Sequence, residues 1–196
     1  MSFTTGGLFL QESLKVATLY LDLQNWKSVS QKVLDDNILQ TRTLSTAKRN
    51  CREIIERLKN LNKNEIDFFL TTNFTEQKYL LWIAICRYYH FIADFAVEVL
   101  RERFISLKGS LNCEDFDSFF NKQSDWYPEL EKITENTRHK LRQVLFKIMM
   151  EAELLLPENT INTVFLTSSF CSLISENRRK DLLLFPIFDN ELARLA

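Results

Sequence analysis

Four cationic residues lie close together in this sequence, with no acidic residue among them. They are Arg42, Lys48, Arg49 and Arg52. Guanidinium and ammonium groups clustered in this way can neutralise the phosphates of a nucleic acid. Ser45 and Thr46 lie between these cations and add hydroxyl groups that can donate hydrogen bonds to phosphate oxygens. The segment is therefore a candidate polyanion-binding site, although an ordinary solvated helix face has the same composition.

A helix must position these cations, and the apolar spacing predicts one from about Leu44 to Leu61. At about 100° per residue, the large side chains gather on one face, while the basic side chains fall on the neighbouring flank. The predicted apolar face consists of Ala47, Cys51, Ile54, Ile55 and Leu58.

Local ion pairs are expected to neutralise the second half of this helix. Glu53 and Arg57 are four residues apart, as are Arg52 and Glu56, and residues at that spacing are neighbours on a helix surface. Such pairing leaves Lys48 and Arg49 without an acidic partner, with Arg42 just before them. The first turns of the helix are therefore the predicted point of contact with a polyanion.

The segment before this helix resembles the first half of a helix-turn-helix. Ser28 and Gln31 have the spacing of a capping box, which predicts a short helix, and a connection with the sequence ILQTRT follows. In a helix-turn-helix the second helix contacts DNA through its amino-terminal residues. The connection contains no glycine, so Asn37 is expected to supply the left-handed backbone conformation that a turn needs.

Two later groups of cations could extend such a binding surface. The first is Arg138, Lys140 and Arg142, which begin a predicted helix, and the second is Arg178, Arg179 and Lys180. For each group the alternative is a solvated helix face.

Enzyme chemistry has little support in the sequence. His90 lies in the aromatic run RYYHF and is expected in the core or at its boundary, while His139 is expected on the surface. Two histidines with scattered cysteines do not make a zinc site, and no glycine-rich phosphate loop or nucleophile elbow occurs. We therefore expect no catalytic residues, no metal, no cofactor and no small-molecule substrate.

Composition predicts an all-α protein built as a compact helical bundle. The 196 residues include only three Gly and three Pro, too few for many strands joined by tight turns. The net charge of −1 gives no general indication of a nucleic-acid partner. The cysteines are scattered and no apolar run is long enough to span a bilayer, so we expect a cytoplasmic protein that does not contact membranes.

The helices are expected to form a single domain over residues 1–196. An amino-terminal subdomain of residues 1–72 and a carboxyl-terminal one of residues 73–196 are the alternative. A long apolar helix to about Leu107 is predicted to be the buried centre, with a break near Tyr89 and His90.

Several segments together resemble the BrxA family of BREX bacteriophage-exclusion systems. They are GGLFLQES, DNILQTRTLSTAKRNCREIIERL, LLWIAICRYYHFIADF and TENTRHKLRQVLFKIMMEAELL, which occur in this order over essentially the whole chain. The resemblance implies a helical fold similar to NusB, binding to double-stranded DNA, a role in phage resistance, and other BREX proteins as partners. The family motif positions in this chain are Asn37, Gln40, Arg42, Ser45, Thr46, Arg49 and Arg52.

One property departs from a dedicated DNA-binding protein. The isoelectric point of about 6.2 predicts weak binding or binding assisted by a partner. Two other functions stay open from the residues: an assembly factor that docks another defence protein through exposed apolar side chains, and an RNA-binding protein similar to NusB.

Overall fold

The chain divides into two compact units, each built from helices. The computed structural model describes residue 3 and residues 6–195, and the side chains of these except residues 175–177 and 195. The amino-terminal unit is Leu8–Tyr88, and the carboxyl-terminal unit combines Tyr89–Ala196 with Met1–Gly7. No β-strand occurs in the described residues, so the predicted all-α class is confirmed.

The amino-terminal unit holds five helices, of which α5 is the most deeply buried. Helix α5 is buried from Tyr79 to Cys86 without interruption, as its apolar sequence predicts, and it contacts α1, α3 and α4. These contacts place α5 in the amino-terminal unit, so the units divide after Tyr88 rather than near Thr72. The five helices are α1 (Leu10–Leu23), α2 (Trp26–Asp35), α3 (Leu44–Leu58), α4 (Lys63–Thr71) and α5 (Phe74–Tyr88).

Side chains at the helix starts explain where these elements begin. Asn25 caps α2 by accepting hydrogen bonds from the backbone N–H groups of Lys27 and Ser28, so α2 begins before the predicted Ser28 box. Helix α4 begins with a capping box, because the Asn62 side chain accepts from Glu65 N and the Glu65 carboxylate accepts from Asn62 N.

The predicted break at Tyr89 is present, and it marks the start of the carboxyl-terminal unit. Tyr89 is extended, with φ −115° and ψ 91°, and α6 starts at the next residue. His90 is therefore the first residue of a helix and is exposed, where the sequence predicted a core or boundary position. The helical elements of this unit are α6 (His90–Phe95), η1 (a π-helix, Ala96–Arg101), α7 (Glu102–Ile105), α8 (Cys113–Ser124), α9 (Pro128–Glu131), α10 (Glu135–Glu151), η2 (Pro157–Asn159), α11 (Ser168–Arg178), η3 (Arg179–Leu184) and α12 (Asp189–Leu195).

Phenylalanines form the centre of the carboxyl-terminal unit. Phe116, Phe119 and Phe120 lie on the buried face of α8, as their spacing predicts. Phe91 and Phe95 of α6 pack against them, with ring centroids 5.1–6.0 Å apart and mostly edge-to-face. This aromatic cluster fixes the orientation of α8 relative to α6.

The described residues contain neither a cluster of metal ligands nor a single helix that could cross a membrane. No group of three or more His, Cys, Asp or Glu side chains in that part of the chain could hold a metal ion. No single described helix is long and apolar enough to cross a membrane. Of these helices, only α5 and the helix that follows it, counted together, have the necessary length and apolar composition.

Candidate nucleic-acid interface

The connection between α2 and α3 is an ordered turn that depends on two residues with positive φ. Asn37 has φ 44°, which confirms the predicted left-handed residue, and Gln40 has φ 50°. The Asn37 side chain accepts a hydrogen bond from Thr41 N at 3.2 Å, and Leu39 is buried. An asparagine tolerates this conformation at lower cost than most residues, and the buried leucine anchors the loop to the core.

Thr43 caps the amino terminus of α3. Its hydroxyl accepts from Thr46 N at 3.2 Å and lies 3.1 Å from the Ser45 hydroxyl and 2.9 Å from that of Thr46. The cap leaves the backbone N–H groups of Leu44 and Ser45 without a partner among the residues that the structure describes. These two N–H groups and the positive end of the helix dipole give the first turn of α3 affinity for an anion.

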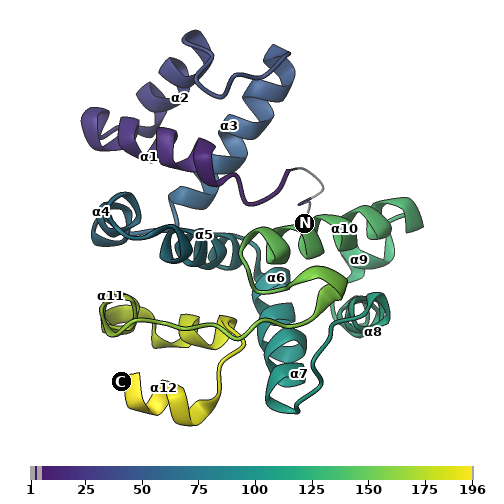
Figure 1. The fold of residues 1–196 in the computed structure, drawn as a ribbon. Helices are drawn as coiled ribbons and strands as arrows, with labels where there is room; N and C mark the ends of the chain where they lie inside the picture. Colours follow the sequence, from purple (N-terminus) through teal and green to yellow (C-terminus); the bar gives the residue numbers. More distant parts are fainter. Residues whose placement is uncertain (1–2, 4–5, 196) are drawn as a thin grey trace. The chain divides into compact units, whose positions relative to one another are not determined.

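The apolar face of α3 holds the helix against the rest of the amino-terminal unit. All five predicted residues are buried: Ala47, Cys51, Ile54, Ile55 and Leu58. Burial also raises the pKa of the Cys51 thiol, opposed in part by a contact with Ser30, so this thiol stays neutral in the core. Helix α3 packs against α1, α2 and α5, and its first turn lies at the end of the unit away from α4 and α5 (Figure 1).

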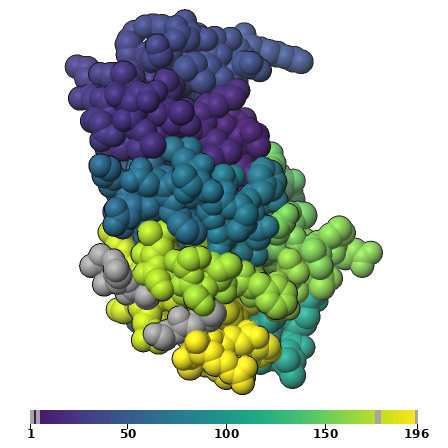
Figure 2. All heavy atoms as spheres, turned by 60° about the vertical axis from the view of Figure 1, so that its left-hand side comes forward, coloured from purple at the N-terminus to yellow at the C-terminus, as the bar shows by residue number. Residues whose placement is uncertain are grey.

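The basic flank, defined as Arg42, Lys48, Arg49 and Arg52, is exposed at this end of the unit. No ion pair or side-chain hydrogen bond engages any of the four within the described part of the chain. The expected Arg52–Glu56 pair is not formed, because the Glu56 carboxylate instead accepts from Lys59 Nζ at 2.6 Å. Arg52 therefore joins the cations that face solvent, and the basic flank is larger than the local pairing rule predicted. Figure 2 shows the atoms of the α2–α3 connection and of the start of α3 at the outer edge of the unit.

Arg57 differs from these four residues because it belongs to the core. It pairs with Glu53 at 2.9 Å as predicted, but only 2% of its side chain is exposed. Its guanidinium lies 5.6 Å from the centroid of the Phe9 ring. The contact with Phe9 therefore connects α3 to the start of α1. The Arg57–Glu53 pair does not neutralise a solvated surface.

The acidic residues that precede the basic flank along the chain already have partners. Asp35 accepts hydrogen bonds from the Gln31 side chain at 2.9 Å, and Asp36 forms an ion pair with Lys32 at 3.6 Å. Each pair joins residues four apart at the end of α2. The remaining residues of the predicted site, Asn37, Gln40 and Ser45, are exposed, and Thr46 is half-buried.

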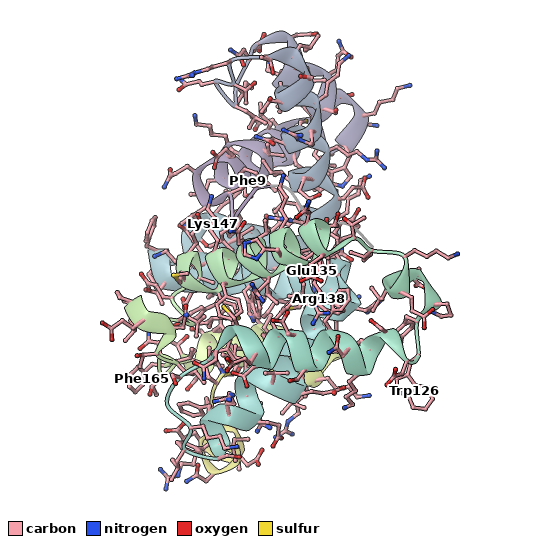
Figure 3. All side chains as sticks on the ribbon, turned by 90° about the vertical axis from the view of Figure 1, so that its right-hand side faces the viewer. Phe9, Trp126, Glu135, Arg138, Lys147 and Phe165 are labelled. Carbon is pink, nitrogen blue, oxygen red and sulfur yellow. The ribbon has the colours of Figure 1, made fainter. Side chains whose placement is uncertain are left out.

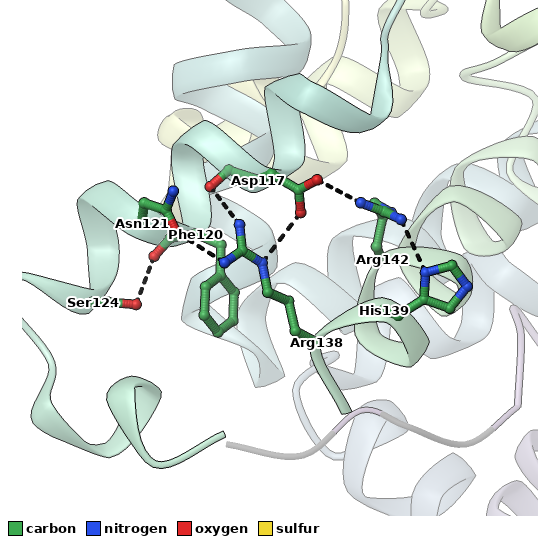
Figure 4. Close-up of polar contacts among 7 residues, drawn as sticks. All are labelled: Asp117, Phe120, Asn121, Ser124, Arg138, His139 and Arg142. Atoms are coloured by element: carbon green, nitrogen blue, oxygen red, sulfur yellow. Dashed lines mark hydrogen bonds and ion pairs between the residues drawn. The ribbon is translucent and has the colours of Figure 1, made fainter. Parts of the chain in front are cut away.

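The second group of cations has a different environment. Arg138 Nε and Arg142 Nη1 both donate to the carboxylate of Asp117 on α8, at 3.2 and 2.5 Å (Figure 4). Arg138 also donates to the Asn121 side chain at 2.9 Å, and its guanidinium lies 4.8 Å from the centroid of the Phe120 ring. These contacts join α10 to α8, so both arginines have a structural role.

Lys140 is the exception in this group, since it is exposed and has no ion pair among the described residues. Arg142 Nη2 lies 2.9 Å from His139 Nδ1. An arginine only donates, so Nδ1 is the acceptor of this hydrogen bond. The structure thus leaves one solvent-facing cation where the sequence predicted three.

Two features of the site were missed from the sequence. Thr43 is the true cap of α3, and the preference of threonine for that position could have identified it. Leu44, the apolar residue next to the cap, is 59% exposed. The first turn of a helix projects beyond its packing partners, so periodicity alone does not reveal this exposure.

Comparison with known proteins gives consistent matches over most of the chain. A family model described as BrxA matches residues 1–178. A relative from Escherichia coli O9:H4 (strain HS), named BREX protein BrxA, is 29% identical over 150 residues, which are 75% of this chain and 69% of that protein. A relative of the same name from Bacillus cereus (strain H3081.97) is 27% identical over 124 residues, which are 63% of this chain and 62% of that protein.

A solved structure shares the fold. The crystal structure of an uncharacterized protein from Magnetospirillum magneticum superposes with a TM-score of 0.77 at 17% sequence identity, covering 92% of this chain and 93% of that one. The helical arrangement is therefore one that an experimentally determined protein adopts.

Proposed function

The chain belongs to the BrxA family, and from this premise we propose that it is a non-enzymatic component of a BREX phage-exclusion system that binds duplex DNA. The matched relatives are named as BREX proteins, which supports a place in the same kind of system and contact with other components of it. The family resemblance supports duplex DNA as the ligand.

The basic flank is the observation that carries this proposal. Its four cations are exposed, adjacent and free of ion pairs in the described residues, beside two unpaired N–H groups at the start of α3. The guanidinium and ammonium groups neutralise backbone phosphates, and the Leu44 and Ser45 N–H groups donate to one phosphate at the helix end. Ser45 and Thr46 add hydroxyl donors.

Phosphate contacts dominate this mode of binding, so it is expected to depend little on base sequence. Asn37 and Gln40 are exposed on the turn beside the cations, and they position the backbone rather than read base edges. A site of only four cations gives modest affinity at physiological salt.

The test is a fluorescence anisotropy titration of the full chain with duplex DNA at several salt concentrations. Replacing Lys48 and Arg49 with alanine should reduce the slope of log affinity against log salt by about two, since each lost phosphate contact removes roughly one unit. Lys140→Ala, which removes an equally exposed cation elsewhere, should leave the slope unchanged. A wild-type slope in the double variant would overturn the assignment of this site.

Competition with single-stranded DNA and with RNA of the same length separates the proposed ligand from the alternatives. Stronger competition by RNA would favour a function like that of NusB. Absence of all nucleic-acid binding at physiological salt would favour an assembly factor.

A further inference from the structure

We propose that the connection between α8 and α9 is a docking site for an arginine- and lysine-rich segment of a partner protein. The docking ridge, defined as residues 125–131, carries two neighbouring aromatic side chains that face solvent. Trp126 is 76% exposed and Tyr127 is 48% exposed. Trp and Tyr are the side chains most often found as anchors of protein interfaces, and an exposed pair is costly to leave solvated.

The backbone of the docking ridge is held in place. Trp126 N and Tyr127 N both donate to the carbonyl oxygen of Gln123, at 3.1 and 3.0 Å. Leu130 is buried and attaches α9 to α8, and Pro128 restricts the backbone at the start of α9. Because the backbone is already ordered, a partner that binds here does not have to immobilise a flexible loop.

The charge of the docking ridge indicates the chemistry of the partner. Asp125, Glu129 and Glu131 are exposed and form no ion pair within the described part of the chain. One cation, Lys132, follows them. Carboxylates beside the aromatic rings repel phosphate, so they disfavour nucleic acid and anionic lipid, and they attract guanidinium and ammonium groups.

The indole ring favours the same partner. The face of a tryptophan ring attracts a guanidinium or ammonium group more strongly than that of tyrosine or phenylalanine does. Arginine is expected to be the better partner residue, because its planar group stacks on the ring and also donates in pairs to a carboxylate. The ridge offers both kinds of contact within seven consecutive residues.

Phe165 provides a comparison within the same unit. It is 80% exposed, but no charged residue lies in the segment from Thr160 to Ser169. Figure 3 shows Trp126 and Phe165 on opposite sides of the view, so they do not form one apolar patch. Exposure of an aromatic ring is therefore shared by both sites, whereas the acidic surroundings are specific to the docking ridge.

The test uses the full chain and a fluorescent peptide of about fifteen residues in which arginines alternate with serine and leucine. Wild-type protein should bind this peptide in an anisotropy titration, with affinity that falls as salt increases. Trp126→Ala should weaken binding by about tenfold, and Trp126→Phe by less. Glu129→Gln with Glu131→Gln should weaken binding and flatten the salt dependence, while Phe165→Ala should bind as the wild type does.

Three results would overturn the proposal. The first is equal binding by Trp126→Ala and wild type, and the second is an equal loss in Phe165→Ala, which would show non-specific adhesion. The third is concentration-dependent self-association in sedimentation that Trp126→Ala abolishes, since a second copy would then be the occupant. Duplex DNA binding by Trp126→Ala should be unchanged, so this test and the test of the DNA site fail independently.

Discussion

At the residue scale, Asp117 shows how one side chain decides the role of two others. Its carboxylate accepts from both Arg138 and Arg142, and it withdraws these cations from the surface where the sequence placed them. The two arginines lie 21 and 25 residues away along the chain. No rule based on local spacing identifies such a partner, because the contact exists only after α8 and α10 have packed.

Replacing Asp117 with alanine should destabilise the protein. Two partly buried guanidinium groups lose their anion, which is expected to lower the free energy of unfolding by about 2 kcal/mol. In a protein of this size that corresponds to a fall in Tm of about 4–8 °C. Asp125→Asn is the control, because Asp125 is exposed at the end of α8 without an ion pair among the described residues, and its Tm should stay near that of wild type. Equal Tm values for Asp117→Ala and Asp125→Asn would mean that the contacts of Asp117 with Arg138 and Arg142 add no stability.

Asp94 gives a prediction about pH. Burial, and then the neighbouring Glu98, raise the pKa of this carboxyl, while His90 acts in the opposite direction. The folded state therefore binds the proton more tightly than the unfolded chain, so the fold loses stability as pH rises through the folded-state pKa of Asp94.

Asp94→Asn should consequently raise Tm at neutral pH by a small amount. The difference between variant and wild type should narrow as pH falls through the folded-state pKa, because the protonated wild type no longer carries the buried charge. Calorimetry from pH 4 to pH 8 measures this directly. A difference in Tm that stays constant over that range would contradict the assignment. The control is Glu102→Gln, which replaces an exposed carboxylate on α7.

At the element scale, some features of α3 follow from the periodicity of its sequence, and others depend on tertiary packing. Its apolar face and the left-handed Asn37 follow from spacing and residue type, so both could be predicted. The burial of Arg57 could not, because it depends on the Phe9 ring reaching α3 from α1. The same limit applies to the choice of Lys59 over Arg52 as the partner of Glu56, since both spacings are allowed on a helix.

Two further features of the elements lay outside sequence reasoning. The π-helix η1 interrupts the α-helical segment after Tyr89, and no composition distinguishes it from an α-helix. The exposure of Trp126 and Tyr127 on the docking ridge, just before α9 begins at Pro128, is not indicated by the local sequence. In each case the tertiary packing, and not the local sequence, selects the conformation.

The junction of α4 and α5 provides a prediction at this scale. The Glu65 carboxylate caps α4 and also accepts from two Arg87 nitrogens on α5, at 2.7 and 2.6 Å, with 3% and 6% of the two side chains exposed. Glu65→Gln should cost about 3 kcal/mol, because it leaves a buried guanidinium without its counter-charge. Asn62→Ala removes only the cap and should cost about 1 kcal/mol. Urea denaturation of both variants checks the ranking, and a cost for Glu65→Gln no greater than that for Asn62→Ala would contradict it.

At the scale of the whole molecule, the near-neutral net charge conceals a division between the two units. The amino-terminal unit has twelve Lys and Arg against nine Asp and Glu, a net charge of +3. The carboxyl-terminal unit has thirteen against seventeen, a net charge of −4. The basic flank lies in the positive unit and the docking ridge in the negative one, so the two proposed partners are of opposite charge. The isoelectric point of the chain therefore describes neither site.

This division predicts how strongly DNA binding should depend on salt. Counterion release follows the number of phosphates contacted locally and not the net charge of the protein, so four cations should give a slope of log affinity against log salt of about −4. Affinity for duplex DNA should then fall by about 250-fold between roughly 50 and 200 mM salt. A chain that bound through its net charge would instead show almost no salt dependence, since that charge is −1. A slope steeper than about −6 would show that cations beyond the basic flank, with the exposed Arg178, Arg179 and Lys180 as the first candidates, also contact phosphate.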